Sequence, residues 1–130
     1  MADLVLDTHA CVYALSAPSK LGAAGLKALR QAEAGRCTAW IPAAVVAEIV
    51  MLKELDRIGI GLPELRIAMA ESGAFRLLPL DLRQLDEFAA LRGIHDPFDR
   101  LIIGACRAVD GRLLTKDQRI QDSGLVVCLW

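Results

Sequence analysis

The sequence contains few aromatic residues and no cysteine spacing typical of a metal site or a disulfide framework. Phe, Trp and Tyr together make up 5% of the 130 residues, so an apolar core has to consist mainly of aliphatic side chains. The four cysteines, Cys11, Cys37, Cys106 and Cys128, form no CxxC pair, and each lies in an apolar stretch. They are predicted to be reduced core residues of a cytosolic protein.

The sequence also lacks an excess of either charge and a long hydrophobic run. The formal net charge of −1 argues against a passive nucleic-acid binder, but not against an enzyme that contacts RNA through a metal ion and a few arginines. The longest apolar run, residues 40–52, is interrupted by Pro42 and Glu48 and falls short of the ~20 residues that a membrane-spanning helix needs. The first residues lack the basic start and apolar stretch of a signal peptide. We therefore expect a soluble, cytoplasmic protein that does not contact a membrane.

Short apolar runs alternate with helical patterns along the chain, whose length suits a single domain spanning residues 1–130. The predicted strands are residues 4–6, 38–41, 75–80, 112–115 and 126–129. The predicted helices are residues 10–15, 22–34, 42–56, 63–71, 82–92 and 97–110, with a short helical turn at 116–122. Strands that alternate with helices favour parallel pairing, and apolar strands favour a sheet covered on both faces. The predicted fold class is α/β, a three-layer α/β/α sandwich with a five-stranded, mainly parallel sheet.

Three aspartates fall where such a sheet usually places its functional site, beyond the carboxyl ends of the strands. Asp7 ends the first predicted strand, and Asp117 lies two residues beyond the fourth. Asp99 lies in the first turn of the helix that leads into the fourth strand. If the first and fourth strands are neighbours, all three carboxylates open onto the same edge of the sheet.

Glu48 is the only polar residue in the segment 43–52, which is otherwise made of apolar side chains. On a helix, its neighbours at three and four positions are all apolar. A charged side chain on such a face is rare unless it is paired or bound to a metal ion. A metal ligand is therefore one prediction for Glu48, and a buried salt bridge to Arg100 or Arg107 is the alternative.

Each aspartate also has a purely structural explanation. Asp7 and Asp117 are placed to cap the helices that follow them, and Asp99 suits the positive end of a helix dipole. Asp96 precedes a proline, so it is better explained as a helix N-cap than as a metal ligand. The structural explanations are strong for the residues taken singly.

As a group, the carboxylates are harder to explain as caps and surface charges. Carboxylates that are close together repel one another and raise each other's pKa, and a divalent cation relieves that repulsion. Oxygen-only ligands suit Mg²⁺ or Mn²⁺, and such ions promote phosphodiester hydrolysis. His9 and His95 are further candidates for ligands or bases, although a lone histidine beside a capping aspartate is more often a structural residue.

The sequence resembles the PIN-domain family, and most closely the toxin ribonucleases of bacterial toxin–antitoxin pairs, the VapC type. The matching segments are Leu-Asp-Thr-His-Ala at 6–10, Ala-Glu-Ile at 47–49, His-Asp-Pro-Phe-Asp-Arg at 95–100 and Leu-Leu-Thr-Lys-Asp at 113–117. They follow the order and spacing of the family and cover nearly the whole chain. Two departures are Ala47, where the family usually has Ser, and the lack of an Arg between His95 and Asp96.

The resemblance implies a parallel sheet of order 3-2-1-4-5 and an RNA-cleaving site that holds Mg²⁺ or Mn²⁺. The residues expected to bind the metal and catalyse the reaction are Asp7, Glu48, Asp99 and Asp117. The residues expected to support them are Thr8, Thr115 and Asp96, and Arg100 is a candidate for contact with the substrate. The resemblance also implies a small antitoxin partner whose tail lies in the site groove, and a homodimer.

Three other functions remain open from the sequence. A phosphatase with an aspartyl nucleophile also has Asp after its first strand, but it normally has a second Asp two residues later, where this chain has His9. A phosphate-accepting receiver domain needs an acceptor after its third strand, for which Asp81 is the candidate. A catalytically silent interaction domain would use the carboxylates only as caps and in salt bridges.

Overall fold

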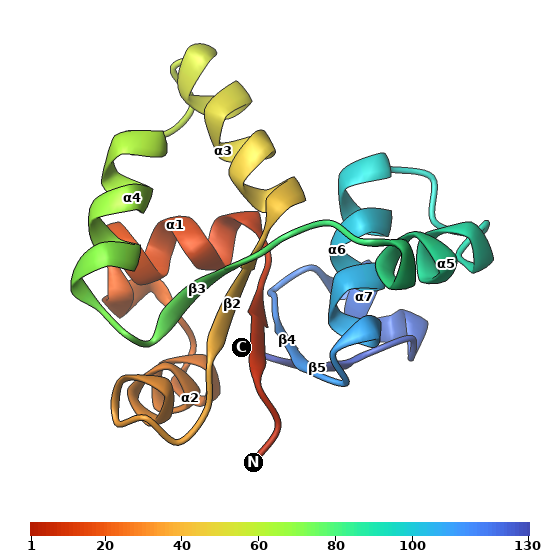
Figure 1. The fold of residues 1–130 in the computed structure, drawn as a ribbon, viewed down its shortest axis with the longest axis horizontal. Coiled ribbons are helices and arrows are strands. Elements are labelled where there is room, and N and C mark those ends of the chain that lie inside the picture. The colour runs from red at the N-terminus through yellow and green to blue at the C-terminus, as the bar shows by residue number, and fades with distance from the viewer.

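Five parallel strands form the centre of the fold, and helices connect each strand to the next (Figure 1). The computed structural model describes all 130 residues. The elements, in chain order, are β1 (Leu4–Leu6), α1 (Thr8–Ser16), the 3₁₀ helix η1 (Pro18–Lys20), α2 (Ala23–Glu33), β2 (Ala39–Pro42), α3 (Ala43–Glu54), α4 (Leu62–Glu71), β3 (Phe75–Leu78), α5 (Leu82–Ala90), α6 (Pro97–Ala108), β4 (Arg112–Leu114), α7 (Gln118–Ser123) and β5 (Val127–Leu129). The predicted α/β class is therefore confirmed.

The strand order is β3-β2-β1-β4-β5, as the resemblance implied. β1 is the central strand: Leu4 pairs with Ala39 of β2 on one side and with Arg112 of β4 on the other. All three residues of β1 are fully buried, which explains why this strand is a continuous apolar run. Because β1 and β4 are neighbours, the segments that follow them emerge side by side at one edge of the sheet.

Asp3 fixes the entry of the chain into the sheet. Its Oδ1 accepts a hydrogen bond from the Thr38 amide at 2.9 Å, and its Oδ2 accepts one from Trp40 Nε1 at 3.0 Å. Both partners lie at the start of β2 or just before it. This carboxylate therefore ties two neighbouring strands together at the edge opposite to their carboxyl ends.

The helices form two groups in Figure 1, with α1, α3 and α4 on one side and α5, α6 and α7 on the other. α5 and α6 pack closely against each other, and α3 contacts both α1 and α6. The core beneath them is aliphatic, as the low aromatic content predicted. None of the helices combines the length and apolarity that a membrane crossing would need.

All four cysteines are free thiols, and Cys11 and Cys106 are buried in the core as predicted. Burial raises the pKa of both thiols to about 12, so they stay protonated and unreactive at neutral pH. Cys37 and Cys128 are half-buried.

Most element boundaries differ from the predictions by one or two residues. Pro42, predicted to open a helix, is instead the last residue of β2 and the residue before α3. β3 ends at Leu78 because Pro79 has no amide hydrogen to continue the strand pairing, and α5 ends at Ala90. Gly35, predicted to stop the preceding helix, does adopt a left-handed φ of 79° just beyond α2.

Candidate functional site

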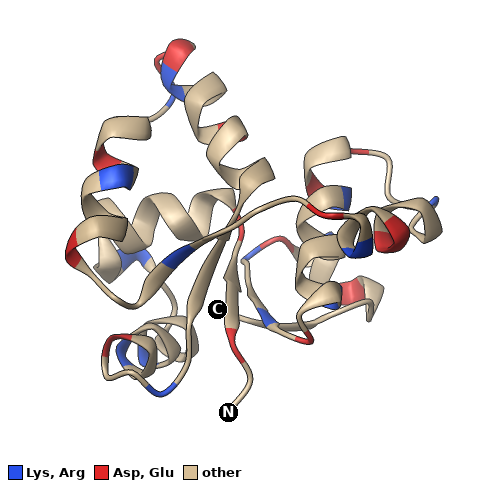
Figure 2. Ribbon diagram, in the orientation of Figure 1, with Lys and Arg blue, Asp and Glu red and all other residues tan.

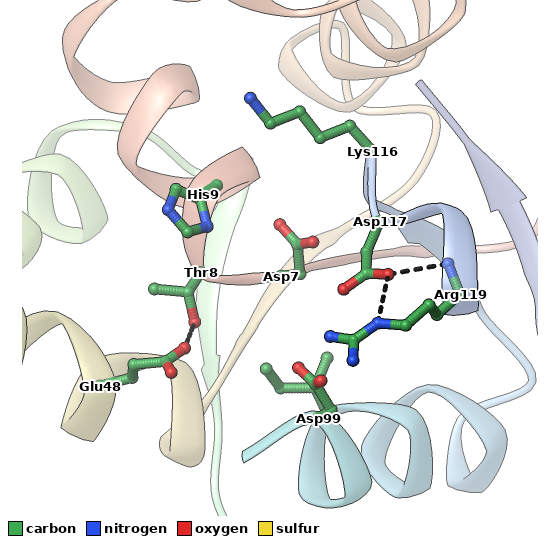
Figure 3. A pocket seen from close by; sticks show the side chains of 9 residues that line it. Asp7, Thr8, His9, Glu48, Asp99, Lys116, Asp117 and Arg119 are labelled. Carbon is green, nitrogen blue, oxygen red and sulfur yellow. Dashed lines mark hydrogen bonds and ion pairs between the residues drawn. The ribbon is translucent and has the colours of Figure 1, made fainter. Parts of the chain in front are cut away.

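A cavity of about 410 Å³ lies at the carboxyl ends of β1 and β4, where the two strands open between the helices (Figure 3). The residues that line it are Asp7, Thr8, His9, Glu48, Asp99, Ile102, Lys116, Asp117 and Arg119. The four acidic residues come from four separate parts of the chain, and only one lining residue is hydrophobic. The structure therefore brings together all four carboxylates that the sequence predicted as a group.

Asp7 reaches the cavity because it directly follows the central strand. Its amide donates to the Leu114 carbonyl of β4 at 3.2 Å, and its Oδ1 accepts from the Ala10 amide at 2.8 Å. The side chain thus caps α1, as the structural explanation predicted. Burial raises the pKa of the Asp7 carboxyl above its ordinary value, whereas hydrogen bonds from the Thr115 side chain and the Ala10 amide act in the opposite direction.

Asp117 is held in the same way at the start of α7. Its Oδ1 accepts from the amides of Arg119 at 2.9 Å and Ile120 at 3.4 Å. The fully buried Thr115 hydroxyl accepts from the Asp117 amide at 3.1 Å, which fixes the backbone after β4. The capping hydrogen bonds of Asp7 and Asp117 are accepted by Oδ1 in both residues, so Oδ2 of each carboxylate makes no capping contact. Capping and ligand binding are therefore compatible in both residues.

Asp99 lies in the first turn of α6, and its carboxylate accepts no hydrogen bond from the chain. Asp96 is the N-cap of this helix, since its Oδ1 accepts from the Asp99 amide at 3.0 Å. The pKa of Asp99 is raised to about 6, first by burial and then by the negative charges of Asp96, Asp117 and Glu48. The charge on Asp99 is thus disfavoured by the other carboxylates of the site.

Glu48 is half-buried on α3 and forms no salt bridge. Its Oε1 accepts a hydrogen bond from the buried hydroxyl of Thr8, which orients the carboxylate in the cavity (Figure 3). The predicted alternative of a buried ion pair is wrong for both arginines. Arg107 pairs with Glu87 at 2.7 Å, and Arg100 is engaged elsewhere.

Arg100 does not line the cavity. Its Nε donates to the Phe88 carbonyl at 2.7 Å, and its guanidinium lies 4.2 Å from the centre of the Phe88 ring. Arg100 therefore joins α6 to α5, and its position does not support the predicted contact with the substrate. Asp81, the candidate acceptor of a receiver domain, caps α5 through the Gln84 amide and is also absent from the cavity.

Two cationic residues of the cavity, Lys116 and Arg119, were not predicted from the sequence. Arg119 Nε lies 3.8 Å from Asp117 Oδ1, and its side chain is 88% exposed. Both residues lie within two positions of Asp117 in the sequence, and this closeness is the only sequence signal that places them at the cavity.

Elsewhere the basic residues are scattered over helices and turns and do not form one continuous stripe (Figure 2). His9 lines the cavity, whereas His95 lies in an adjoining one with Asp96 and Asp99.

The side chains, as they lie, do not bring three or more Asp, Glu, His or Cys groups close enough to hold a metal ion. The donor set nevertheless suits a hard divalent cation, because the four acidic residues offer only carboxylate oxygens. The raised pKa values of Asp7 and Asp99 fit the same idea, since a bound cation would favour the charged forms. Side-chain movements would be needed to bring these oxygens onto one ion.

Comparison with known proteins gives one family and several solved structures. The family model described as the PIN domain matches residues 4–124. A chain of the VapBC2 complex from Rickettsia felis, solved with a DNA fragment from their promoter, has a TM-score of 0.70 at 16% identity and covers 97% of this chain and 96% of its own. A chain of DNA-bound VapBC from Salmonella typhimurium has a TM-score of 0.70 at 14% identity and covers 99% of this chain and 98% of its own. A chain of FitAcB from Neisseria gonorrhoeae has a TM-score of 0.65 at 17% identity and covers 98% of this chain and 96% of its own. No curated protein sequence matches significantly.

Proposed function

Because this chain belongs to the PIN-domain family, whose model spans residues 4–124, we propose that it is a Mg²⁺- or Mn²⁺-dependent ribonuclease. The proposed reaction is hydrolysis of RNA phosphodiester bonds, and the proposed biological role is the toxin of a toxin–antitoxin pair. The observation that best supports the reaction is that four carboxylates from four separate segments line one cavity. Helix capping accounts for Asp7 and Asp117 taken singly, but not for the convergence of all four carboxylates on one cavity.

Asp7, Glu48, Asp99 and Asp117 are the residues proposed to hold the ion or ions. A divalent cation bound there would lower the pKa of an attacking water and neutralise charge that develops on the phosphate. Thr8 supports the site through its hydrogen bond to Glu48, and Thr115 supports it through the Asp117 amide and the Asp7 side chain. Such outer contacts keep ligands oriented before the ion arrives.

Asp96 has an indirect role in this proposal. It caps α6 and so fixes the first turn that presents Asp99. Its own charge also contributes to the raised pKa of Asp99. The chain therefore holds Asp99 in a position where its negative charge is unfavourable until a cation is present.

The proposed partners are a small VapB-like antitoxin and a second copy of the chain. The support is the likeness of the fold to chains of toxin–antitoxin complexes. An antitoxin tail that offers an arginine would find four carboxylates in the cavity, which is a favourable match of charge. The homodimer and the cytoplasmic location stay predictions from the sequence.

Incubation of the purified chain with total RNA and Mn²⁺ tests the proposed reaction. The wild type should cleave RNA in Mn²⁺ or Mg²⁺ and lose the activity in chelator, whereas Asp99→Asn should be at least 100-fold slower. Asp86→Asn is the matched control, because Asp86 is exposed on α5 and makes no hydrogen bond or ion pair. Equal cleavage by the wild type and Asp99→Asn would contradict the proposal.

The second candidate is the silent interaction domain, which the capping roles of Asp7 and Asp117 favour. Thermal melting separates the two functions. A nuclease site should raise the melting temperature of the wild type in Mn²⁺ through linkage, whereas Asp7→Asn with Asp99→Asn should lose that gain without melting lower in chelator. The melting temperature of a catalytically silent domain should not change when Mn²⁺ is added.

A further inference from the structure

Lysine and aromatic side chains gather on one rim of the acidic cavity. Lys116 Nζ lies 5.1 Å from the centre of the Tyr13 ring and 5.9 Å from that of the Trp130 ring, and it donates to the Tyr13 hydroxyl at 3.3 Å. Lys20 Nζ lies 5.5 Å from the same Tyr13 ring, and the Tyr13 and Trp130 rings meet edge to face at 6.1 Å. We call Tyr13, Lys20, Lys116 and Trp130 the lysine–aromatic cluster.

This gathering is unusual for the composition of the chain. The sequence has four lysines, one tyrosine and two tryptophans, so the cluster contains half of the lysines and two of these three aromatic residues. A chain of this length is expected to contain about two cation–aromatic contacts. It has four, and three of them belong to the cluster.

Neither lysine of the cluster is neutralised by a carboxylate. The three ion pairs of the protein involve Arg30, Arg107 and Arg119. Lys116 lines the cavity together with Asp7 and Asp117, but Figure 3 shows its side chain leading away from Asp117. The ammonium group is therefore held by aromatic rings and a hydroxyl beside the acidic cavity, where it has no anionic partner within the chain.

We propose that the lysine–aromatic cluster binds a phosphate of the RNA backbone next to the phosphate that is cleaved in the acidic cavity. This inference rests on the proposed ribonuclease function and adds a substrate subsite to it. Four carboxylates repel a polyanion, so productive binding needs fixed cations at the rim. Lys116 and Lys20 supply two such charges, and an ammonium already held by rings loses little freedom when a phosphate binds.

Tyr13 acts here as a positioning residue for Lys116, because its ring and its hydroxyl both contact the ammonium. Tyr13→Phe keeps the ring and removes the hydroxyl contact, so it should weaken RNA binding less than loss of the lysine. Lys116→Arg keeps the charge and should retain most of the binding. These graded effects separate a charge contact from a merely structural role.

RNA binding by Asp99→Asn protein tests the inference without interference from cleavage. The probe is a fluorescent single-stranded RNA of about 12 nucleotides, titrated in Mg²⁺ at several salt concentrations. Lys116→Gln should weaken binding about five- to tenfold and reduce the slope of log affinity against log salt by about 0.7, the value for one lost phosphate contact on a single strand. Lys27→Gln is the matched control, since Lys27 is exposed on α2 and has no aromatic or acidic partner.

Equal affinity and equal salt slope for Lys116→Gln and Lys27→Gln would overturn the inference. It would also be overturned if a poly-glutamate peptide of the same charge bound as tightly as the RNA with the same dependence on Lys116, because the cluster would then suit an acidic protein segment. Failure of the ribonuclease proposal is distinguishable: the wild type would cut no RNA even if binding still depended on Lys116. Melting of Lys116→Gln within about 2 °C of wild type is expected, because Lys116 is exposed.

Discussion

Asp99→Asn should stabilise the metal-free protein at neutral pH. The folded protein raises the pKa of Asp99 from 3.8 to about 6, because burial and three neighbouring carboxylates disfavour its negative charge. A carboxyl group whose pKa is raised on folding favours the native state while it is protonated, and this contribution is lost as the pH rises through the folded pKa. Asparagine is neutral at every pH, so the stability of the variant does not fall as the pH rises through the pKa of Asp99.

The expected gain is about 1 kcal/mol at pH 7.5. The rise in pKa from 3.8 to about 6 sets a ceiling of about 3 kcal/mol. Asp99 is half-exposed, so solvent screening removes much of this, and asparagine also gives up the favourable interaction of a carboxylate with the first turn of α6. A gain of about 1 kcal/mol corresponds to roughly 3–5 °C in melting temperature for a chain of this size.

Thermal melts in chelator between pH 4.5 and pH 8 measure this effect for the wild type, Asp99→Asn and the control Asp86→Asn. The advantage of Asp99→Asn should be largest above pH 7 and should become smaller as the pH falls towards 4.5, because the contribution of Asp99 changes between its unfolded pKa of 3.8 and its folded pKa of about 6. Adding Mn²⁺ at pH 7.5 should raise the melting temperature of the wild type more than that of Asp99→Asn. A variant that melts lower than the wild type at pH 7.5, or an advantage that does not change with pH, would refute the electrostatic reasoning.

Three further predictions concern the ion, the supporting threonine and the sheet. The affinity for Mn²⁺, measured by calorimetry, should fall about tenfold for each pH unit below about 6, because the ion must displace the proton of Asp99. Thr8→Val should lower RNA cleavage about tenfold or more, since Glu48 loses its orienting hydrogen bond, and Thr8→Ser should keep most of the activity. Asp3→Ala should lower the free energy of unfolding by about 2–3 kcal/mol in urea titrations, because the Thr38 amide and Trp40 Nε1 lose their acceptor, while stabilisation by Mn²⁺ stays unchanged.

Local signals in the sequence were sufficient for most of the fold. The apolar run at Leu4–Leu6 identifies a buried strand because a sheet covered on both faces excludes polar side chains. Asp96 followed by Pro97 identifies the start of α6 because the first supplies the cap and the second the backbone angle of the first helical residue. Element ends were less predictable, as the early end of β3 at Leu78 shows.

The convergence of the site depends on a long-range pairing that periodicity does not specify. Asp7 and Asp117 meet because β1 pairs with β4, and the sequence indicated this neighbour relation only through its family resemblance. Glu48 was recognised from its apolar surroundings, but its partner Thr8 lies 40 residues away and no local pattern links the two. Lys116 was missed because its surroundings, the rings of Tyr13 and Trp130, are assembled only in the folded chain.

Titration of the protein with Mn²⁺ by calorimetry tests most directly whether the four carboxylates serve one cation site. Wild type should bind the ion, and Asp7→Asn, Asp99→Asn and Asp117→Asn should each weaken binding more than tenfold while Asp86→Asn binds normally. If the three site variants bound Mn²⁺ as well as the wild type does, or if the wild type bound none, the carboxylates would not share an ion and the proposed hydrolysis would have no basis.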